Sequence, residues 1–386
     1  MEPMLPQSGN SELGDLALDL VSKASAFAGR LNPVVRTSIG DLVRSMNCYY
    51  SNLIEGHNTH PRDIDRALSE DFSAEPEKRA LQKEAVAHIE VQKMIDTGHH
   101  IGAPPLSGKY AAWLHYEFCS RLPEELLYVE NPDTQERIKV IPGELRDGTV
   151  VVGKHFPPYP QNLPNFLRRF DEAYESNRLS KTDRIIASAA AHHRLLWIHP
   201  FYDGNGRVAR LMSYAALLEL GIGSELWSVA RGLARNVEEY KSLLQAADQP
   251  RRGDLDGRGT LSQNALTSFC KFFLKTSIDQ IDFMESLLDF NTLSERMRIY
   301  VEEEIAFKRL PKGSYPLLRE ALLVGEFDRG RAQELTGYKE RMARDVVSDL
   351  QKKGFLISDN TRSPLRLGFP IEVVERWFPL LYPTTR

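Results

Sequence analysis

The stretch 198–211, IHPFYDGNGRVARL, decides how the surrounding chain is organised, because it lies between two apolar helical patterns. The first pattern ends near His199 and the second begins after Gly204. Glycines in the DGNG loop let backbone N–H groups converge, since a residue without a Cβ adopts conformations closed to others. Such a nest at the start of a helix binds anions through its free amides and the positive end of the helix dipole. The stretch therefore predicts an anion-binding loop between two helices.

The charged residues around this loop favour a polyphosphate as the anion. Arg207 and Arg210 lie three residues apart in the first turns of the second helix, and two guanidinium groups suit a polyphosphate better than a single carboxylate. Asp203 would repel phosphate unless a cation lies between them, and a carboxylate with phosphate oxygens and water is a usual Mg²⁺ arrangement. His199 can act as a general base near neutral pH. The alternative is a helix stop and a turn with solvated arginines, but all these features together favour a site.

At residues 199–210 the sequence HPFYDGNGRVAR resembles the Fic signature HxFx[D/E]GNGRxxR at every fixed position. Fic proteins typically transfer AMP from ATP to a hydroxyl group of a target protein. The resemblance implies that His199 deprotonates a Ser, Thr or Tyr hydroxyl and that Asp203 holds Mg²⁺. It therefore implies a protein adenylyltransferase that uses ATP and Mg²⁺, with another phosphate-containing donor as a narrower alternative.

The resemblance also assigns the nucleotide contacts. It implies that Gly204, Asn205 and Gly206 form an anion hole for the α- and β-phosphates. It also implies that Arg207 contacts the β-phosphate and that Arg210 contacts the γ-phosphate. It makes Phe201 a core anchor. Kinase-like relatives replace the glycine after the acidic residue, so a glycine there favours nucleotidyl transfer.

A second motif, SNLIEG at residues 51–56, matches the family's inhibitory pattern [S/T]xxxE[G/N] with Ser51, Glu55 and Gly56 at the fixed positions. Without the first motif, an exposed glutamate before a C-capping glycine would explain it. The resemblance implies that Glu55 binds Arg210, which would otherwise hold the γ-phosphate, so that ATP binds poorly or misaligned. In some relatives such a glutamate also positions water to remove AMP from modified targets.

Residues 138–160 contain β-branched residues around Asp147-Gly148, a strong hairpin turn signal. The resemblance makes 142–160 the family's flap, which docks the target protein by main-chain pairing. The chain itself is a further substrate expected from auto-modification, and a second copy is a candidate homodimer partner. His155 on this segment is expected to be solvated or to face the target.

Weaker signals lie near the motif. Asn236 and Tyr240 resemble residues that border the family's nucleotide pocket, and a helix-capping Asn with a half-buried Tyr is an equal alternative. His192 and His193 lie on an apolar helix and are predicted to be core or interface histidines.

The chain is predicted to be mainly α, with a Fic-type helical core and two small β elements. We expect an N-terminal helical region over 1–104 that begins with a flexible lead, a catalytic core over 105–290, and a winged helix-turn-helix domain over 291–386. The last helix before the terminal ribbon mixes basic and acidic residues, so DNA binding and protein docking both stay open. A nucleotide-sensing transcriptional regulator is therefore the alternative function.

Composition sets outer limits. The 386 residues are 42% hydrophobic and 26% charged, which is typical of a folded protein, and 49 basic against 53 acidic residues give a net charge of −4. This balance creates no general attraction to nucleic acid or to an anionic membrane. Three isolated cysteines, no signal peptide pattern and no apolar run of membrane-spanning length lead us to expect a cytoplasmic protein without a membrane partner.

Overall fold

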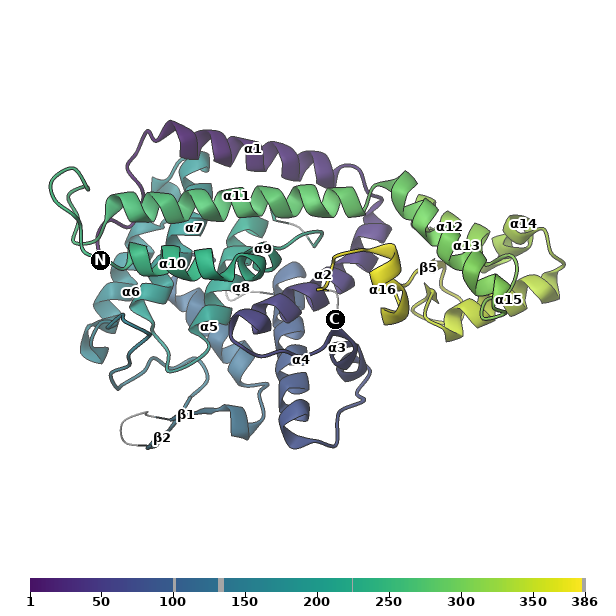
Figure 1. The fold of residues 1–386 in the computed structure, drawn as a ribbon, viewed down its shortest axis with the longest axis horizontal. Coiled ribbons are helices and arrows are strands. Elements are labelled where there is room, and N and C mark those ends of the chain that lie inside the picture. Colours follow the sequence, from purple (N-terminus) through teal and green to yellow (C-terminus); the bar gives the residue numbers. More distant parts are fainter. Residues whose placement is uncertain (100–101, 131–134, 224, 384–386) are drawn as a thin grey trace. The chain divides into compact units, whose positions relative to one another are not determined.

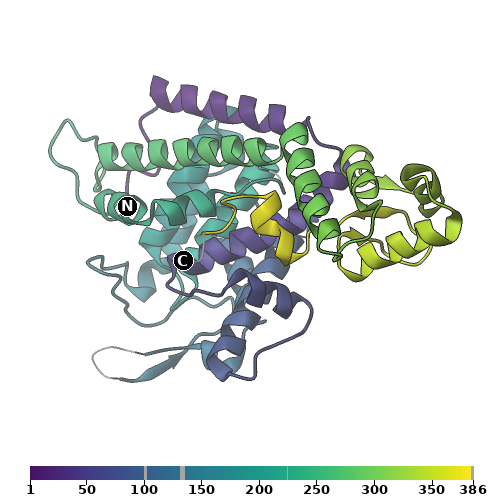
Figure 2. The ribbon, with the colours of Figure 1, turned by 45° about the vertical axis from the view of Figure 1, so that its right-hand side comes forward.

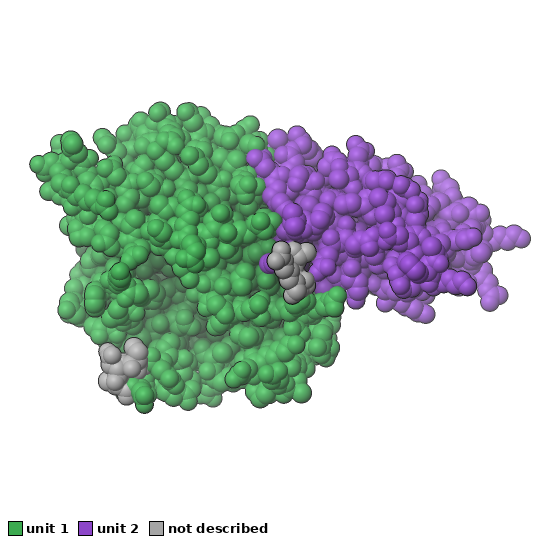
Figure 3. All heavy atoms as spheres, in the orientation of Figure 1, with its two compact units in different colours: residues 1–25, 47–281 green, residues 26–46, 282–386 purple. Residues whose placement is uncertain are grey.

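The computed structural model describes residues 1–99, 102–130, 135–223 and 225–383. Its contacts divide the chain into two compact units, coloured in Figure 3: residues 1–25 with 47–281, and residues 26–46 with 282–386. The expected boundary at 290/291 lies near the boundary at 281/282. The expected N-terminal region 1–104 forms no separate unit, because its residues are shared between the two.

Helices dominate the described chain (Figure 1). The first unit and its joining segments contain α1 (Ser11–Ala28), α2 (Pro33–Ile54), α3 (Pro61–Leu68), α4 (Pro76–Asp96), α5 (Gly108–Cys119), β1 (Tyr128–Glu130), β2 (Arg137–Lys139), α6 (Leu163–Ala173), α7 (Lys181–Ile198), α8 (Asn205–Glu219), α9 (Val229–Arg235), α10 (Val237–Ala247) and α11 (Gln263–Leu287). The second unit contains α12 (Phe290–Ala306), α13 (Ser314–Val324), β3 (Glu326–Phe327), α14 (Ala332–Thr336), α15 (Glu340–Lys352), β4 (Leu356–Ile357), β5 (Leu365–Leu367) and α16 (Ile371–Trp377).

Helices α7 and α8 form the centre of the first unit. Ser180 caps α7 by accepting a hydrogen bond from the Asp183 amide at 3.0 Å. Buried small residues follow along α7, including the run Ala189–Ala191, and they let the neighbouring helices approach closely. Around this centre, α1 and α11 lie side by side in both ribbon views (Figures 1 and 2). The predicted helices are therefore present, and the two around the DGNG loop are the most deeply buried.

The first residues of the chain are anchored, so the expected flexible lead is wrong. Met4 is buried, and its carbonyl accepts a hydrogen bond of 2.7 Å from the Tyr174 hydroxyl. The carbonyl of Pro3 accepts one of 2.9 Å from Nε of the buried Arg194. A buried guanidinium needs acceptors, and here the start of the chain provides one of them.

The expected hairpin turn at Asp147-Gly148 is also wrong. The hairpin strands are β1 and β2, which pair antiparallel earlier in the chain, while Val152 and His155 form only an isolated bridge. Asp147 accepts a hydrogen bond of 2.5 Å from the Tyr202 hydroxyl, and a Cβ on Gly148 would lie 2.6 Å from that oxygen. The Asp-Gly pair is fixed against the loop of the motif, and the chain reverses instead at Gly153 (φ 60°).

The second unit consists of helices followed by a small sheet. Strands β3, β5 and β4 pair antiparallel in that order; β3 lies between α13 and α14, and β4 and β5 follow α15. Its core is aromatic: Trp377 has 0% exposure and its ring lies 6.1 Å from Tyr300 and 5.9 Å from Phe355. Helix α15 precedes the β4–β5 ribbon as predicted, and the unit also contains β3 before α14 and α16 after the ribbon. Whether the unit acts as a winged helix stays a prediction.

Within the part of the chain that the structure describes, no helix has the length and apolar character required to cross a membrane.

Candidate active site

The loop that joins α7 to α8 holds two residues in left-handed backbone conformations. Helix α7 ends at Ile198 and His199 caps it with φ 49°, a conformation that a non-glycine residue rarely adopts. Gly204 has φ 78° and immediately precedes α8. A Cβ added to Gly204 would lie 3.4 Å from the His115 ring. The glycine is therefore favoured by its backbone conformation, and α8 begins directly after it, as the sequence predicts.

Asn205 fixes the shape of this loop. Its Oδ1 accepts a hydrogen bond of 3.0 Å from the Phe201 amide, and its Nδ2 donates one of 2.8 Å to the Phe201 carbonyl. Phe201 is buried, and its ring stacks on His115 with centroids 3.9 Å apart. Phe201 is thus the core anchor that was expected. Asn205 uses both side-chain polar atoms within the loop, while its contact with an α-phosphate stays a prediction.

His199 is held by its backbone from a neighbouring segment. Nε of the buried Arg146 donates a hydrogen bond of 2.8 Å to the His199 carbonyl, and the Arg146 amide donates one of 2.9 Å to the Pro200 carbonyl. Burial, followed by the positive charge of Arg146, lowers the pKa of His199 to about 4. The imidazole is therefore neutral near pH 7, which is the form that can accept a proton.

Arg210 is bound by the residues of the SNLIEG motif, as the resemblance implied. Its Nε donates to the Ser51 hydroxyl at 2.8 Å, and its Nη2 donates to the Ser51 carbonyl at 3.1 Å and to Glu55 Oε1 at 2.5 Å. A Cβ on Gly206 would lie 2.2 Å from the same Glu55 oxygen, so this carboxylate lies over the first turn of α8. Helix α2 ends at Ile54, and Gly56 has φ 88°.

Glu55 is ionised in this position. Burial acts to raise its pKa, but the charges of Arg210 and Arg207 outweigh burial and leave the pKa lowered. The Glu55 side chain keeps 31% of its exposure, whereas that of Arg210 keeps 3%. A carboxylate therefore lies where the sequence predicts a phosphate, next to the guanidinium group expected to bind it.

Arg207 has a partner that the sequence did not predict. Its Nη2 forms an ion pair with Oε1 of Glu84, a residue of α4 that is 2% exposed. The other carboxylate oxygen lies 2.7 Å from Nδ1 of His57, and the Arg207 guanidinium carbon lies 5.3 Å above the Phe118 ring. A signal exists in the sequence, because Glu84 interrupts the apolar face of α4. Periodicity alone does not show what lies opposite it.

Asp203 is the most open of the motif's charged residues. Its side chain is 54% exposed, and its nearest carboxylate oxygen lies 3.9 Å from Nη1 of Arg207. Among the residues described, no group of three or more His, Cys, Asp or Glu side chains is arranged to hold a metal. One exposed carboxylate beside an anion nest fits Mg²⁺, which keeps several waters and is commonly bound by one or two carboxylates together with substrate phosphates.

Tyr240 and Asn236, the two residues predicted either to border the nucleotide pocket or to have structural roles, differ in their surroundings. Tyr240 is fully buried, not half-buried, and its hydroxyl lies 2.7 Å from Nε2 of His192, whose Nδ1 lies 2.9 Å from the Ser213 hydroxyl. Asn236 donates to the Gly232 carbonyl at 2.9 Å, as a residue at a helix end does. His192 is thus a core histidine with both nitrogens bonded, as predicted.

His193 and His155 are also bonded to backbone carbonyls. His193 is a core histidine as predicted, with Nε2 3.1 Å from the Leu244 carbonyl. Nε2 of His155 lies 2.7 Å from the Trp197 carbonyl, so this ring attaches the flap to α7, whereas it was expected to be solvated or target-facing.

The first turn of α8, two buried arginines and a neutral histidine thus lie together in a helical domain. Residues 124–217 match the model of the Fic/DOC family, so the chain carries a Fic/DOC family domain. Curated relatives include proteins named Protein adenylyltransferase Fic from Drosophila erecta and Drosophila melanogaster, each 40% identical over 79 residues. That match covers 20% of this chain and 16% of each relative.

Solved structures support the fold. Fic-1 (residues 134–508) from C. elegans is 16% identical, with a TM-score of 0.52 over 74% of this chain and 80% of its own. A Fic domain containing signaling protein from Bacteroides thetaiotaomicron is 19% identical, with a TM-score of 0.51 over 70% and 96%. The prediction of a mainly helical Fic-type fold is confirmed.

Proposed function

We propose that this protein transfers AMP from ATP to Ser, Thr or Tyr hydroxyl groups of target proteins and of itself. One observation carries the proposal: a neutral His199 lies in the loop before α8, whose Arg207 and Arg210 are buried. The Fic/DOC domain and the relatives named as adenylyltransferases support the same class of reaction.

In the proposed AMP transfer, His199, Arg207 and Arg210 have separate roles. The target hydroxyl oxygen bonds to the α-phosphorus of ATP, and the bond from that phosphorus to the bridging oxygen of pyrophosphate breaks. His199 accepts the hydroxyl proton, which its lowered pKa permits at neutral pH. The first-turn amides of α8 and the guanidinium groups of Arg207 and Arg210 stabilise the negative charge that leaves with pyrophosphate.

Asp203 is the proposed residue for Mg²⁺. The ion, when bound, would neutralise phosphate charge and so make the α-phosphorus easier to attack. Its carboxylate is 54% exposed and therefore accessible from solvent, and phosphate and water oxygens would supply the other ligands.

Glu55 is the proposed inhibitor. Its carboxylate binds the Arg210 guanidinium and covers Gly206. To reach Arg210, the γ-phosphate would have to displace the charge-assisted hydrogen bond between Arg210 and Glu55. The same carboxylate, 31% exposed, could hold a water molecule for removal of AMP from a modified target. Loss of Glu55 would then increase transfer and decrease removal.

Residues 142–160 are the proposed docking segment for the target. Three of its apolar side chains are strongly exposed: Val151 at 60%, Phe156 at 75% and Tyr159 at 64%. Apart from the isolated Val152–His155 bridge, this segment belongs to no strand, and an extended target segment would pair with its backbone.

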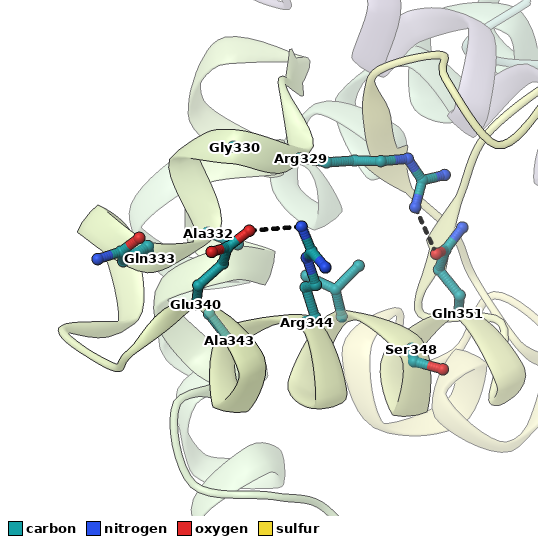
Figure 4. A pocket seen from close by; sticks show the side chains of 10 residues that line it. Arg329, Gly330, Ala332, Gln333, Glu340, Ala343, Arg344, Ser348 and Gln351 are labelled. Atoms are coloured by element: carbon teal, nitrogen blue, oxygen red, sulfur yellow. Dashed lines mark hydrogen bonds and ion pairs between the residues drawn. The ribbon is translucent and has the colours of Figure 1, made fainter.

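The alternative function, a transcriptional regulator, would act through the second unit. Figure 4 shows a pocket of about 650 Å³ between residues 329–333 and α15, where Arg344 pairs with Glu340 and Arg329 donates to Gln351 at 2.8 Å. At the C-terminal end of α15, the capping residue Lys353 pairs with Asp349 at 2.7 Å. A helix that binds DNA presents unpaired cations to phosphates. Arg344 and Lys353 have carboxylate partners, whereas Lys339, Arg341 and Lys352 form no ion pair with the residues that the structure describes, so DNA binding by this segment stays a prediction.

Intact mass measurement tests the proposal. The protein and its Glu55→Gly and Glu55→Gly/His199→Ala variants are incubated with Mg²⁺ and ATP. We expect the mass of AMP on Glu55→Gly and no added mass on the double variant. A phosphate mass would indicate a kinase, and no added mass on either variant, alone or with added protein substrates, would overturn the proposal.

A further inference from the structure

The segment that carries the inhibitory glutamate has a second attachment, two residues beyond Glu55. Nδ1 of His57 lies 2.7 Å from Oε2 of Glu84, across 27 positions of the sequence. The His57 side chain is 37% exposed and that of Glu84 only 2%. The contact therefore joins the loop after α2 to a carboxylate inside the domain.

Glu84 has two donors of different kinds. Arg207 Nη2 binds Oε1, and His57 binds Oε2, while His57 Nδ1 and Arg207 Nη2 lie 3.1 Å apart. At this distance the two nitrogens can both donate to the same carboxylate, that of Glu84. In this arrangement His57 Nδ1 carries a proton and directs it at Glu84. A buried carboxylate requires such partners, because an unpaired charge in the interior is strongly unfavourable.

The surroundings of His57 strengthen this attachment. Its hydrogen bond to Glu84 raises the pKa of His57; burial and the charge of Arg207 oppose this effect, and the charges of Glu84 and Asp203 add to it. Glu55 lies on the same turn and also interacts with the His57 charge. Acidic groups therefore surround this histidine on the same turn, on α4 and before α8.

The geometry points to a second lock on the inhibitory turn: His57 fixes it to Glu84, and Glu84 is a positioning residue that also orients Arg207. This inference rests on the proposed function for its activity readout. Residues 55–57 are then held at both ends, by Glu55 on Arg210 and by His57 on Glu84. Gly56 between them has φ 88° and no atom within 4 Å of an added Cβ, so the turn has open space around its middle.

The lock has a specific consequence for Arg207. Glu84 occupies Nη2, whereas Nη1 forms a longer ion pair, of 3.9 Å, with Asp203. Glu84 thus leaves one edge of the guanidinium available for a phosphate. Loss of His57 should weaken inhibition and preserve the orientation of Arg207. Loss of the Glu84 charge should weaken inhibition and also disturb the orientation of Arg207.

Hydrogen–deuterium exchange over residues 52–60, without nucleotide, tests the lock independently of activity. We expect faster exchange in His57→Ala and near-normal exchange in His57→Asn, because an Asn amide can place a donor close to the position of Nδ1. His60→Ala, which removes the side-chain cap of α3 three residues away, is the matched control. Unchanged exchange in His57→Ala would overturn the inference.

Measurements of AMP incorporation distinguish the His57–Glu84 contact from the Glu55–Arg210 contact. His57→Ala should increase incorporation about three- to tenfold, as expected for one partly exposed hydrogen bond to a charged group, and should add little in a Glu55→Gly background. In that background, Glu84→Gln should raise the KM for ATP, while Glu90→Gln on the exposed side of α4 should not. Equal incorporation by His57→Ala and the wild type, with Glu55→Gly active, would contradict the lock; an inactive Glu55→Gly would instead contradict the proposed function.

Discussion

Replacing Glu55 by Gly removes the carboxylate that holds Arg210 and covers Gly206. The Arg210 guanidinium keeps its two hydrogen bonds to Ser51, at 2.8 and 3.1 Å, so the arginine should stay in place. The change therefore frees the proposed γ-phosphate contact without destroying it. We expect tighter ATP binding and faster AMP transfer.

The size of the effect follows from the contact that is lost. A hydrogen bond to a charged group contributes about 1.5–3 kcal/mol. Glu55 keeps 31% of its side-chain exposure, so screening by solvent reduces this to about 1–2 kcal/mol. Since about 1.4 kcal/mol is a tenfold change in an equilibrium constant, the apparent affinity for ATP should increase roughly 5- to 30-fold.

Isothermal titration calorimetry with a non-hydrolysable ATP analogue and Mg²⁺ measures this change directly. Glu55→Gln, which keeps the shape but not the charge, should give an intermediate affinity. Glu77→Gln, an exposed acidic residue in the first turn of α4, is the matched control and should match the wild type. Identical affinities for the wild type and Glu55→Gly would refute the reasoning.

Three further predictions follow from the buried groups. AMP incorporation by Glu55→Gly should show no loss from titration of His199 between roughly pH 6 and 8, because burial lowers the pKa of His199 to about 4; a decline centred near pH 6.5 would contradict this. Arg146→Ala should reduce the free energy of unfolding in urea by about 2–4 kcal/mol, since three backbone carbonyls lose their donor, and Arg146→Lys should lose less. Burial lowers the pKa of His88 and His192 to about 3, so below pH 6.5 the unfolded chain binds protons that the folded chain does not. The urea midpoint should therefore fall between pH 7 and 5, and a constant midpoint would contradict this.

The parts of the site that were predictable from the sequence are local. Gly204 and the adjoining helical patterns specify the loop and the start of α8, because backbone conformation and periodicity depend on neighbouring residues. The contact between Glu55 and Arg210, 155 positions apart, was expected only through the resemblance to Fic proteins. Periodicity identifies a buried face but not its partner.

The missed features depend on distant parts of the chain. Glu84 is visible as a charged residue on a buried helix face, yet nothing local connects it to Arg207. The Asp147-Gly148 pair does not form the hairpin turn that its sequence favours, because a tertiary hydrogen bond from Tyr202 fixes the aspartate elsewhere. Buried Arg194 holds the start of the chain in the same way. Buried polar groups that need partners thus explain most of the differences between prediction and structure.

The central claim is that the site between α7 and α8 transfers AMP under the control of Glu55. Incubation of Glu55→Gly with ATP labelled on the α-phosphate, beside ATP labelled on the γ-phosphate, tests it most directly. We predict that the α-label enters the protein, that the γ-label does not, and that the wild type incorporates less of the α-label. Incorporation of the γ-label, or equal α-label in the wild type and Glu55→Gly, would contradict the claim.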